Sequence, residues 1–84
     1  MAKKQKYRFV KIDWLDINSD SSWAEPSDIL EDVPSKCVSV GWLLLNNKEK
    51  TIVAASRSED GDYGDRTVFP SCVIKKITSL SEES

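Results

Sequence analysis

The strongest constraint on the fold of this chain is a proline that interrupts its last apolar stretch, Thr67–Ile77. Pro70 has no N–H to donate to a β-ladder, and its ring fixes its own φ angle. One strand must therefore end near Pro70, and another must begin after a tight turn. This punctuation is typical of a small β-barrel, and it does not by itself indicate a reaction.

With 84 residues, the chain has room for one domain and for no large substrate cleft. Its composition, 39% hydrophobic and 31% charged, is that of a globular domain and is too apolar for wholesale disorder. We expect a disordered basic tail over residues 1–6, a single domain over residues 7–80 and a frayed tail over residues 81–84.

The cysteine content and the N-terminus predict a reduced, cytoplasmic protein. No apolar run of signal-peptide length follows the basic N-terminus. Cys37 and Cys72 are the only thiols, far below the density of a disulfide-stapled secreted domain. Each lies beside a valine, where a small buried thiol is expected to pack as a modest hydrophobe.

Hydrophobic patterning predicts five strands. The first begins at Tyr7 and alternates, so that Val10, Ile12 and Trp14 share one face. The second is apolar on both faces, which implies either a doubly covered position or a strand that bends at Gly41. The four later strands are expected at Lys36–Leu45, Thr51–Ser56, Arg66–Phe69 and Val73 to about Leu80, with a hairpin turn at residues 46–50.

A long acidic connection separates the first two strands. Ser22 and Glu25, followed by Pro26, have the spacing of a capping box and predict one helical turn through Leu30. A connection of this length is usually functional or is pinned to the body by its own apolar groups. Trp23, Ile29 and Leu30 are the candidates for pinning, and the alternative for Trp23 is an exposed aromatic of a binding surface.

Most of residues 7–80 resembles an SH3-like barrel in the order of its elements: a strand, a long acidic loop, a Trp-containing strand, a hairpin and a strand–Pro–turn–strand unit. Phe69–Val73 is similar to the short 3₁₀ turn that joins the last two strands of that family. The resemblance implies a five-stranded all-β meander barrel. It also implies that the acidic loop supplies specificity for basic peptides, with its carboxylates flanking Trp23 and Trp42.

A second resemblance is to Sm-like barrels. Val40–Leu45, followed by a turn and Thr51–Val53, is similar to the glycine-then-leucine strand pair of the first Sm motif, and Val68–Ile77 is similar to the second motif. This resemblance implies an oligomeric ring. In overall style, with its Trp-x-Asp first strand and Trp-bearing acidic loop, the chain also resembles small phage-encoded proteins of unknown function.

The residue types present argue against catalysis and against a bound cofactor or metal. The chain has no histidine, which removes the commonest general base and a common zinc ligand. Two cysteines cannot fill a tetrahedral zinc site, and the glycines do not form a phosphate-binding loop. The acidic segment Glu59–Asp65 lacks the downstream glutamate of a calcium loop and is interpreted as a solvated turn.

We therefore expect a non-enzymatic protein-interaction or assembly module, with a protein partner or a second copy as its ligand. Its expected protein-binding residues lie in the acidic connection or directly before it: Trp23, Asp16, Asp20, Glu25 and Asp28. The alternative is an Sm-like oligomer that binds single-stranded nucleic acid through basic residues. That reading uses the basic N-terminal segment: Lys3, Lys4, Lys6 and Arg8.

Overall fold

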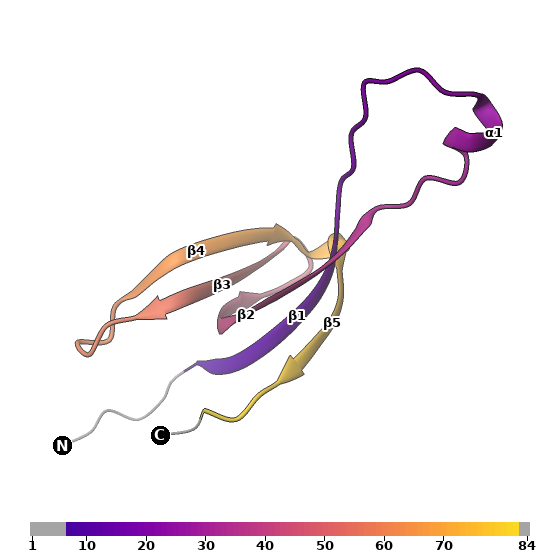
Figure 1. Ribbon diagram of the computed structural model, residues 1–84. Coiled ribbons are helices and arrows are strands. Elements are labelled where there is room, and N and C mark those ends of the chain that lie inside the picture. The colour runs from indigo at the N-terminus through magenta and orange to yellow at the C-terminus, as the bar shows by residue number, and fades with distance from the viewer. Residues whose placement is uncertain (1–6, 83–84) are drawn as a thin grey trace.

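The computed structural model describes residues 7–82, and the expected disordered tail at residues 1–6 and the last two residues lie outside this range. Five antiparallel strands form one sheet in the order β4-β3-β2-β1-β5, and Figure 1 shows their arrangement. The elements are β1 (Arg8–Asp16), α1 (Pro26–Ile29), β2 (Ser35–Asn46), β3 (Lys50–Arg57), β4 (Tyr63–Pro70), a 3₁₀ turn (Ser71–Val73) and β5 (Ile74–Ser79). The predicted all-β class and its five strands are confirmed.

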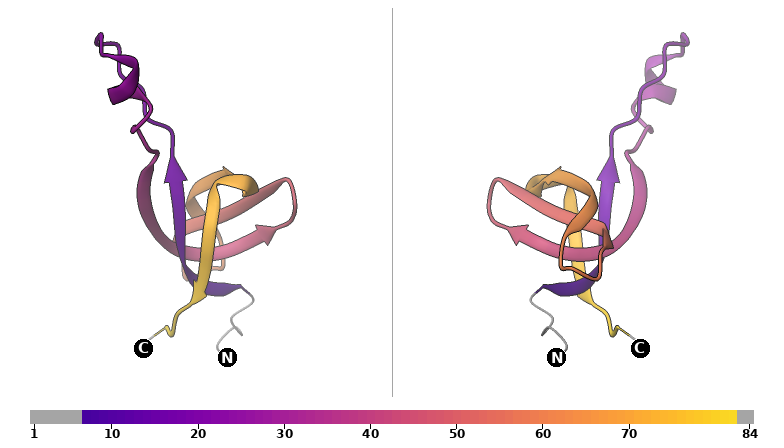
Figure 2. Two further views of the ribbon diagram at one scale, coloured as in Figure 1. Left: turned by 90° about the vertical axis from the view of Figure 1, so that its right-hand side faces the viewer. Right: turned by 90° about the vertical axis from the view of Figure 1, so that its left-hand side faces the viewer.

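The predicted closure into a barrel is not confirmed. The sheet is strongly curved (Figure 2), but in the described residues β4 and β5 remain its two unjoined edges. The long strand β2 pairs with β1 along Ser35–Leu43 and with β3 from Trp42 onward, so it belongs to both halves of the curved sheet.

The core is small and comes from alternate positions of three strands. Val10 and Ile12 of β1 are fully buried and pack with Val53 of β3 and Phe69 of β4. Trp14 packs against this cluster, its ring 5.0 Å from that of Phe69. The predicted inward face of the first strand is therefore confirmed.

Of the two readings offered for the second strand, only the bend agrees with the structure. Val38 and Val40 are 60% and 45% exposed, so the outward face of β2 is not covered. Gly41 is buried where β2 changes partner, and a Cβ built there would lie 2.4 Å from the carbonyl oxygen of Ala54. A side chain at position 41 would therefore force β2 and β3 apart.

The Pro70 turn is confirmed and is held by hydrogen bonds to the β2–β3 hairpin. β4 runs through Pro70, and the 3₁₀ turn follows at once. The Ser71 N–H donates to the Glu49 carbonyl (3.1 Å), and the Ser71 hydroxyl donates to the Asn47 carbonyl (2.6 Å). The fully buried Thr51 hydroxyl lies 2.9 Å from the Ser71 hydroxyl and donates to Asn46 Oδ1. Because its polar atoms find partners, this turn closes one end of the core at little desolvation cost.

The close approach at Gly41 predicts a sharp difference between two glycines. Gly41→Ala should lower the free energy of unfolding by about 1–3 kcal/mol, the usual cost of overpacking, because the new methyl meets Ala54 and Val53. Gly64→Ala is the matched control, since a Cβ there has no heavy atom within 4 Å. Urea unfolding of both variants measures the difference, and equal stabilities would contradict the steric account.

Candidate functional site

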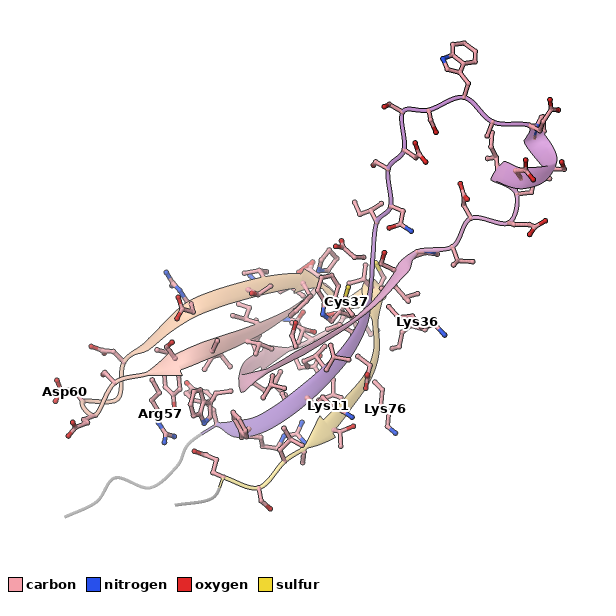
Figure 3. The ribbon with its side chains drawn as sticks, viewed as in Figure 1. Lys11, Lys36, Cys37, Arg57, Asp60 and Lys76 are labelled. Carbon is pink, nitrogen blue, oxygen red and sulfur yellow. The ribbon has the colours of Figure 1, made fainter. Side chains whose placement is uncertain are left out.

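Residues 17–34, which we call the arm, project from the sheet between β1 and β2 (Figures 1 and 3). The molecule measures 63 × 25 × 20 Å and its radius of gyration is 16.9 Å, against about 12 Å for a compact chain of this length. The arm accounts for this elongation, because the five strands gather at the other end of the molecule.

Hydrogen bonds at the base of the arm hold its two halves together. The side-chain amide of Asn18 donates to the Val33 carbonyl (2.5 Å), and the Ser35 hydroxyl donates to Asn18 Oδ1 (2.6 Å). Asp16, the last residue of β1, accepts from the Ile17 N–H. The arm therefore leaves the sheet as an extension of the β1–β2 ribbon.

The predicted helical turn in the arm is confirmed, but its predicted cap is wrong. α1 is four residues long, its N-cap is Glu25, and no side chain caps it. Ser22 instead donates both its hydroxyl and its N–H to the carboxylate of Asp20. The local Asx turn at Asp20 has taken the serine that a capping box would use.

The prediction that apolar side chains pin the loop to the body is also wrong. Trp23 is 100% exposed and Leu30 is 84% exposed, and neither covers the core. Ile17, Ile29 and Val33 are exposed as well, so the arm carries five large apolar side chains in contact with water. Pinning fails because the paired base directs the arm away from the sheet.

The arm is also strongly acidic. Asp20, Glu25, Asp28, Glu31 and Asp32 lie on it, Asp16 lies at its base, and no basic residue occurs between Lys11 and Lys36. Within residues 7–82 none of these carboxylates forms an ion pair. All five predicted protein-binding residues are therefore on the arm or at its base, whereas sequence reasoning did not include Leu30 or Ile17 among them.

Trp42 does not join Trp23, contrary to what the SH3-like resemblance implies. It lies in β2 with its ring centre 5.1 Å from that of Phe9 and 6.0 Å from that of Tyr63. The Arg57 guanidinium stacks 4.6 Å above the Trp42 ring, and Arg57 lies at the end of the molecule opposite the arm (Figure 3). The Nε1 of Trp42 is buried and has no hydrogen-bond partner among residues 7–82. Trp42 is a packing residue of the sheet and not part of the arm surface.

The residues of the nucleic-acid alternative are only partly placed. Lys3, Lys4 and Lys6 lie outside the described residues. Arg8 is exposed at the start of β1, and its Nη1 donates to the Ser79 hydroxyl of β5 (2.8 Å).

The strand register creates a second surface, which sequence reasoning missed. Lys11 pairs with Val40, Asp13 pairs with both Val38 and Lys76, and Leu15 pairs with Lys36, so all these side chains share one face of the sheet. We call it the outer face and define it by Lys11, Lys36, Lys76, Val38 and Val40, with Asp13 as the one carboxylate among them. Figure 3 shows the three lysines on the same side of the sheet. The alternation along each strand was visible in the sequence, but the register between strands was not.

The cysteines and the acidic hairpin have ordinary structural positions. Cys37 and Cys72 are free thiols, and Cys72 is exposed, so its predicted burial is wrong. Residues 58–62 form the β3–β4 turn, in which the Ser58 N–H donates to the Asp62 carbonyl (2.8 Å) and Gly61 has a positive φ of 97°. The predicted turn at Glu59–Asp65 is therefore too long, because β4 already begins at Tyr63. In the described part of the chain, no three His, Cys, Asp or Glu side chains lie close enough to hold a metal ion. None of the helices between residues 7 and 82 is long and apolar enough to span a membrane.

The difference in exposure between Trp23 and Trp14 predicts that their replacement by alanine changes the free energy of unfolding by very different amounts. Trp23→Ala should change the free energy of unfolding by less than about 0.5 kcal/mol, because a fully exposed ring loses no packing. Trp14→Ala should lower it by about 3 kcal/mol or more, since its ring packs on the core and its Nε1 donates to the Ser39 hydroxyl. Thermal unfolding followed by circular dichroism compares them. A large fall for Trp23→Ala would mean that the arm contributes to the fold.

The Asx turn predicts a lowered pKa for the side chain of Asp20, which an NMR titration can measure. The Ser22 hydroxyl and then the Ser22 N–H, both donating to the carboxylate, lower the pKa of Asp20. The ionised carboxylate of Asp20 therefore stabilises the turn fully at a pH above the ordinary aspartate pKa, and this stabilisation is lost as the pH falls through the lowered pKa. Ser22→Ala should raise the Asp20 pKa in an NMR titration of the side-chain carboxyl carbons, whereas the control Ser21→Ala should not. Equal titration in both variants would contradict the hydrogen bonds.

Comparison with known proteins adds no relative: no family model matches the chain, and neither a curated protein nor a solved structure matches it significantly. The resemblances to SH3-like and Sm-like barrels and to small phage proteins stay predictions from the sequence motifs.

Proposed function

We propose that this chain is a non-enzymatic protein-interaction module that contacts its partner through the arm. The observation that carries the proposal is the full exposure of Trp23 on a projecting, acidic segment. A tryptophan in water gains nothing for the fold, whereas the same ring buried against a partner is among the strongest contributors to binding.

The neighbours of Trp23 support the same function. Leu30 and Ile17 expose further apolar area, and the surrounding carboxylates give the arm one sign of charge. Exposed apolar groups rimmed by charges are typical of protein-interaction surfaces. The charge speeds encounter with a basic partner surface, and the apolar groups supply the affinity once they are buried.

The body of the molecule has a supporting role in this proposal. The sheet has its own core without the arm, so the arm can change partners or conformation without unfolding the strands. We place the activity in the cytoplasm, which is the host cytoplasm if the chain is phage-encoded, because the two thiols are unbridged. The curved five-stranded sheet and its 3₁₀ turn are the features on which an SH3-like or Sm-like assignment rests.

The alternative, binding of single-stranded nucleic acid, is less favoured. Phosphates would have to approach a molecule whose largest projection is acidic, and the net charge of the chain is −2. Phe9 and Trp42 follow Lys11 and Val40 on the same face of the sheet, but the Trp42 ring packs against Phe9 and Tyr63 and lies under Arg57, so these rings are already engaged within the chain and are not free to stack on bases.

Photo-crosslinking tests the proposed function directly. Benzoylphenylalanine in place of Trp23 should crosslink a protein in an extract of the cells in which the chain is naturally made, because the arm tip would lie in the interface. The matched control carries the same amino acid in place of Asp62, in the exposed β3–β4 turn.

The outcome is read by mass spectrometry of the crosslinked species. A product specific to position 23, and weakened by Asp28→Asn combined with Glu31→Gln and Asp32→Asn, would support the proposal. The same products from both positions, or none from position 23, would overturn it.

A further inference from the structure

Two surfaces of this chain have opposite charge, and their charged groups form no ion pair within residues 7–82. The arm carries five carboxylates, whereas the outer face carries the three cations Lys11, Lys36 and Lys76 against one carboxylate, Asp13. Neither the arm carboxylates nor these three lysines form an ion pair in the described part of the chain. Each surface also exposes apolar side chains, Trp23 and Leu30 on the arm, Val38 and Val40 on the outer face.

We propose that the partner of the arm is a second copy of this chain, and that two copies exchange arms so that each arm lies on the outer face of the other. This inference rests on the proposed function, since it names the partner of the same surface. Arm carboxylates would face the lysines, and Trp23 and Leu30 would cover Val38 and Val40. The arm and the outer face would therefore complement each other both in charge and in apolar area.

The geometry favours exchange over docking of an arm on its own sheet. Asn18 binds both Val33 and Ser35, and these hydrogen bonds direct the arm along the β1–β2 ribbon and away from the outer face of the same copy. An arm that folded back would have to break them. A second copy needs no such change.

The surfaces are also placed for a symmetric pair. The arm continues the strands β1 and β2, and the same two strands carry Lys11, Lys36, Val38 and Val40. A two-fold axis near the base of the arm therefore brings each arm along the partner's outer face and makes the same contact twice. Two contacts help the pair to approach the roughly 1,200–2,000 Å² that a stable interface buries.

Sedimentation velocity tests this assembly with the full chain. At low salt and a concentration of about 100 µM, the wild-type chain should be a dimer. Added salt should raise the dissociation constant of the dimer, because part of the attraction is between exposed charges. Trp23→Ala should raise the dissociation constant about tenfold or more, as loss of an aromatic hot spot does. This variant is expected to keep its fold, because the Trp23 side chain is fully exposed.

A charge exchange gives the sharpest test. The face variant combines Lys11→Glu, Lys36→Glu and Lys76→Glu, and the arm variant combines Asp28→Lys, Glu31→Lys and Asp32→Lys. Each alone should be monomeric, because arm and face then have the same sign. An equimolar mixture should form a heterodimer, since both contacts regain opposite charges. The control reverses three exposed cations of the β2–β3 turn, β3 and β4, outside the strands β1, β2 and β5 that carry the outer-face lysines: Lys48→Glu, Lys50→Glu and Arg66→Glu. It should remain a dimer.

Three results would overturn the second copy as partner. They are a monomer at every concentration and salt, a dimer that survives both the face and the arm variant, and a monomer whose outer face binds a short oligonucleotide at low salt. The crosslinking experiment at position 23 tests the proposed function separately. If position 23 crosslinks a different protein while the chain is monomeric, only the exchange fails, and if position 23 crosslinks nothing, both proposals fail.

Discussion

The antiparallel ladder between β1 and β2 is the interaction on which the rest of this structure depends. It pairs Arg8 with Leu43 at one end and Asp16 with Ser35 at the other. Because side chains alternate along each strand, the same ladder that directs Val10 and Ile12 into the core also puts Lys11 and Val40 on the outer face. A shift of one residue would exchange the two faces.

The same ladder determines where the arm begins. Its last pair, Asp16 with Ser35, leaves residues 17–34 beyond the reach of β5, which stops pairing with β1 at Trp14. Within residues 7–82 no further strand lies beside the arm, which leaves Trp23 and most of Leu30 uncovered. Exposure of these side chains is thus a consequence of strand length and not of local sequence alone.

The packing of the curved sheet depends on small groups. Gly41 lets β2 pass close to Ala54 as it changes partner from β1 to β3. The Ser71 hydroxyl then ties the Pro70 turn to the β2–β3 hairpin by donating to the Asn47 carbonyl, and it lies 2.9 Å from the Thr51 hydroxyl. The result is a body with a small core and a projecting arm that contributes no residue to that core. Substitutions on the arm are therefore expected to leave folding nearly unchanged, as the proposed interaction surface requires.

The sequence by itself determined the local features: five strands, the Pro70 turn, the hairpin at residues 46–50 and an acidic segment with one helical turn. Each follows from short-range rules, since alternation, proline geometry and turn chemistry act within a few residues. It also singled out the arm residues Trp23, Asp20, Glu25 and Asp28, because an aromatic among acids is unusual at any position. What only the tertiary structure decided is which side chains are left without a partner. The exposure of Trp23, the separation of Trp42 from it and the gathering of Lys11, Lys36 and Lys76 all depend on strand register and strand length. Those are fixed by contacts between residues far apart in the chain, and no local pattern contains them.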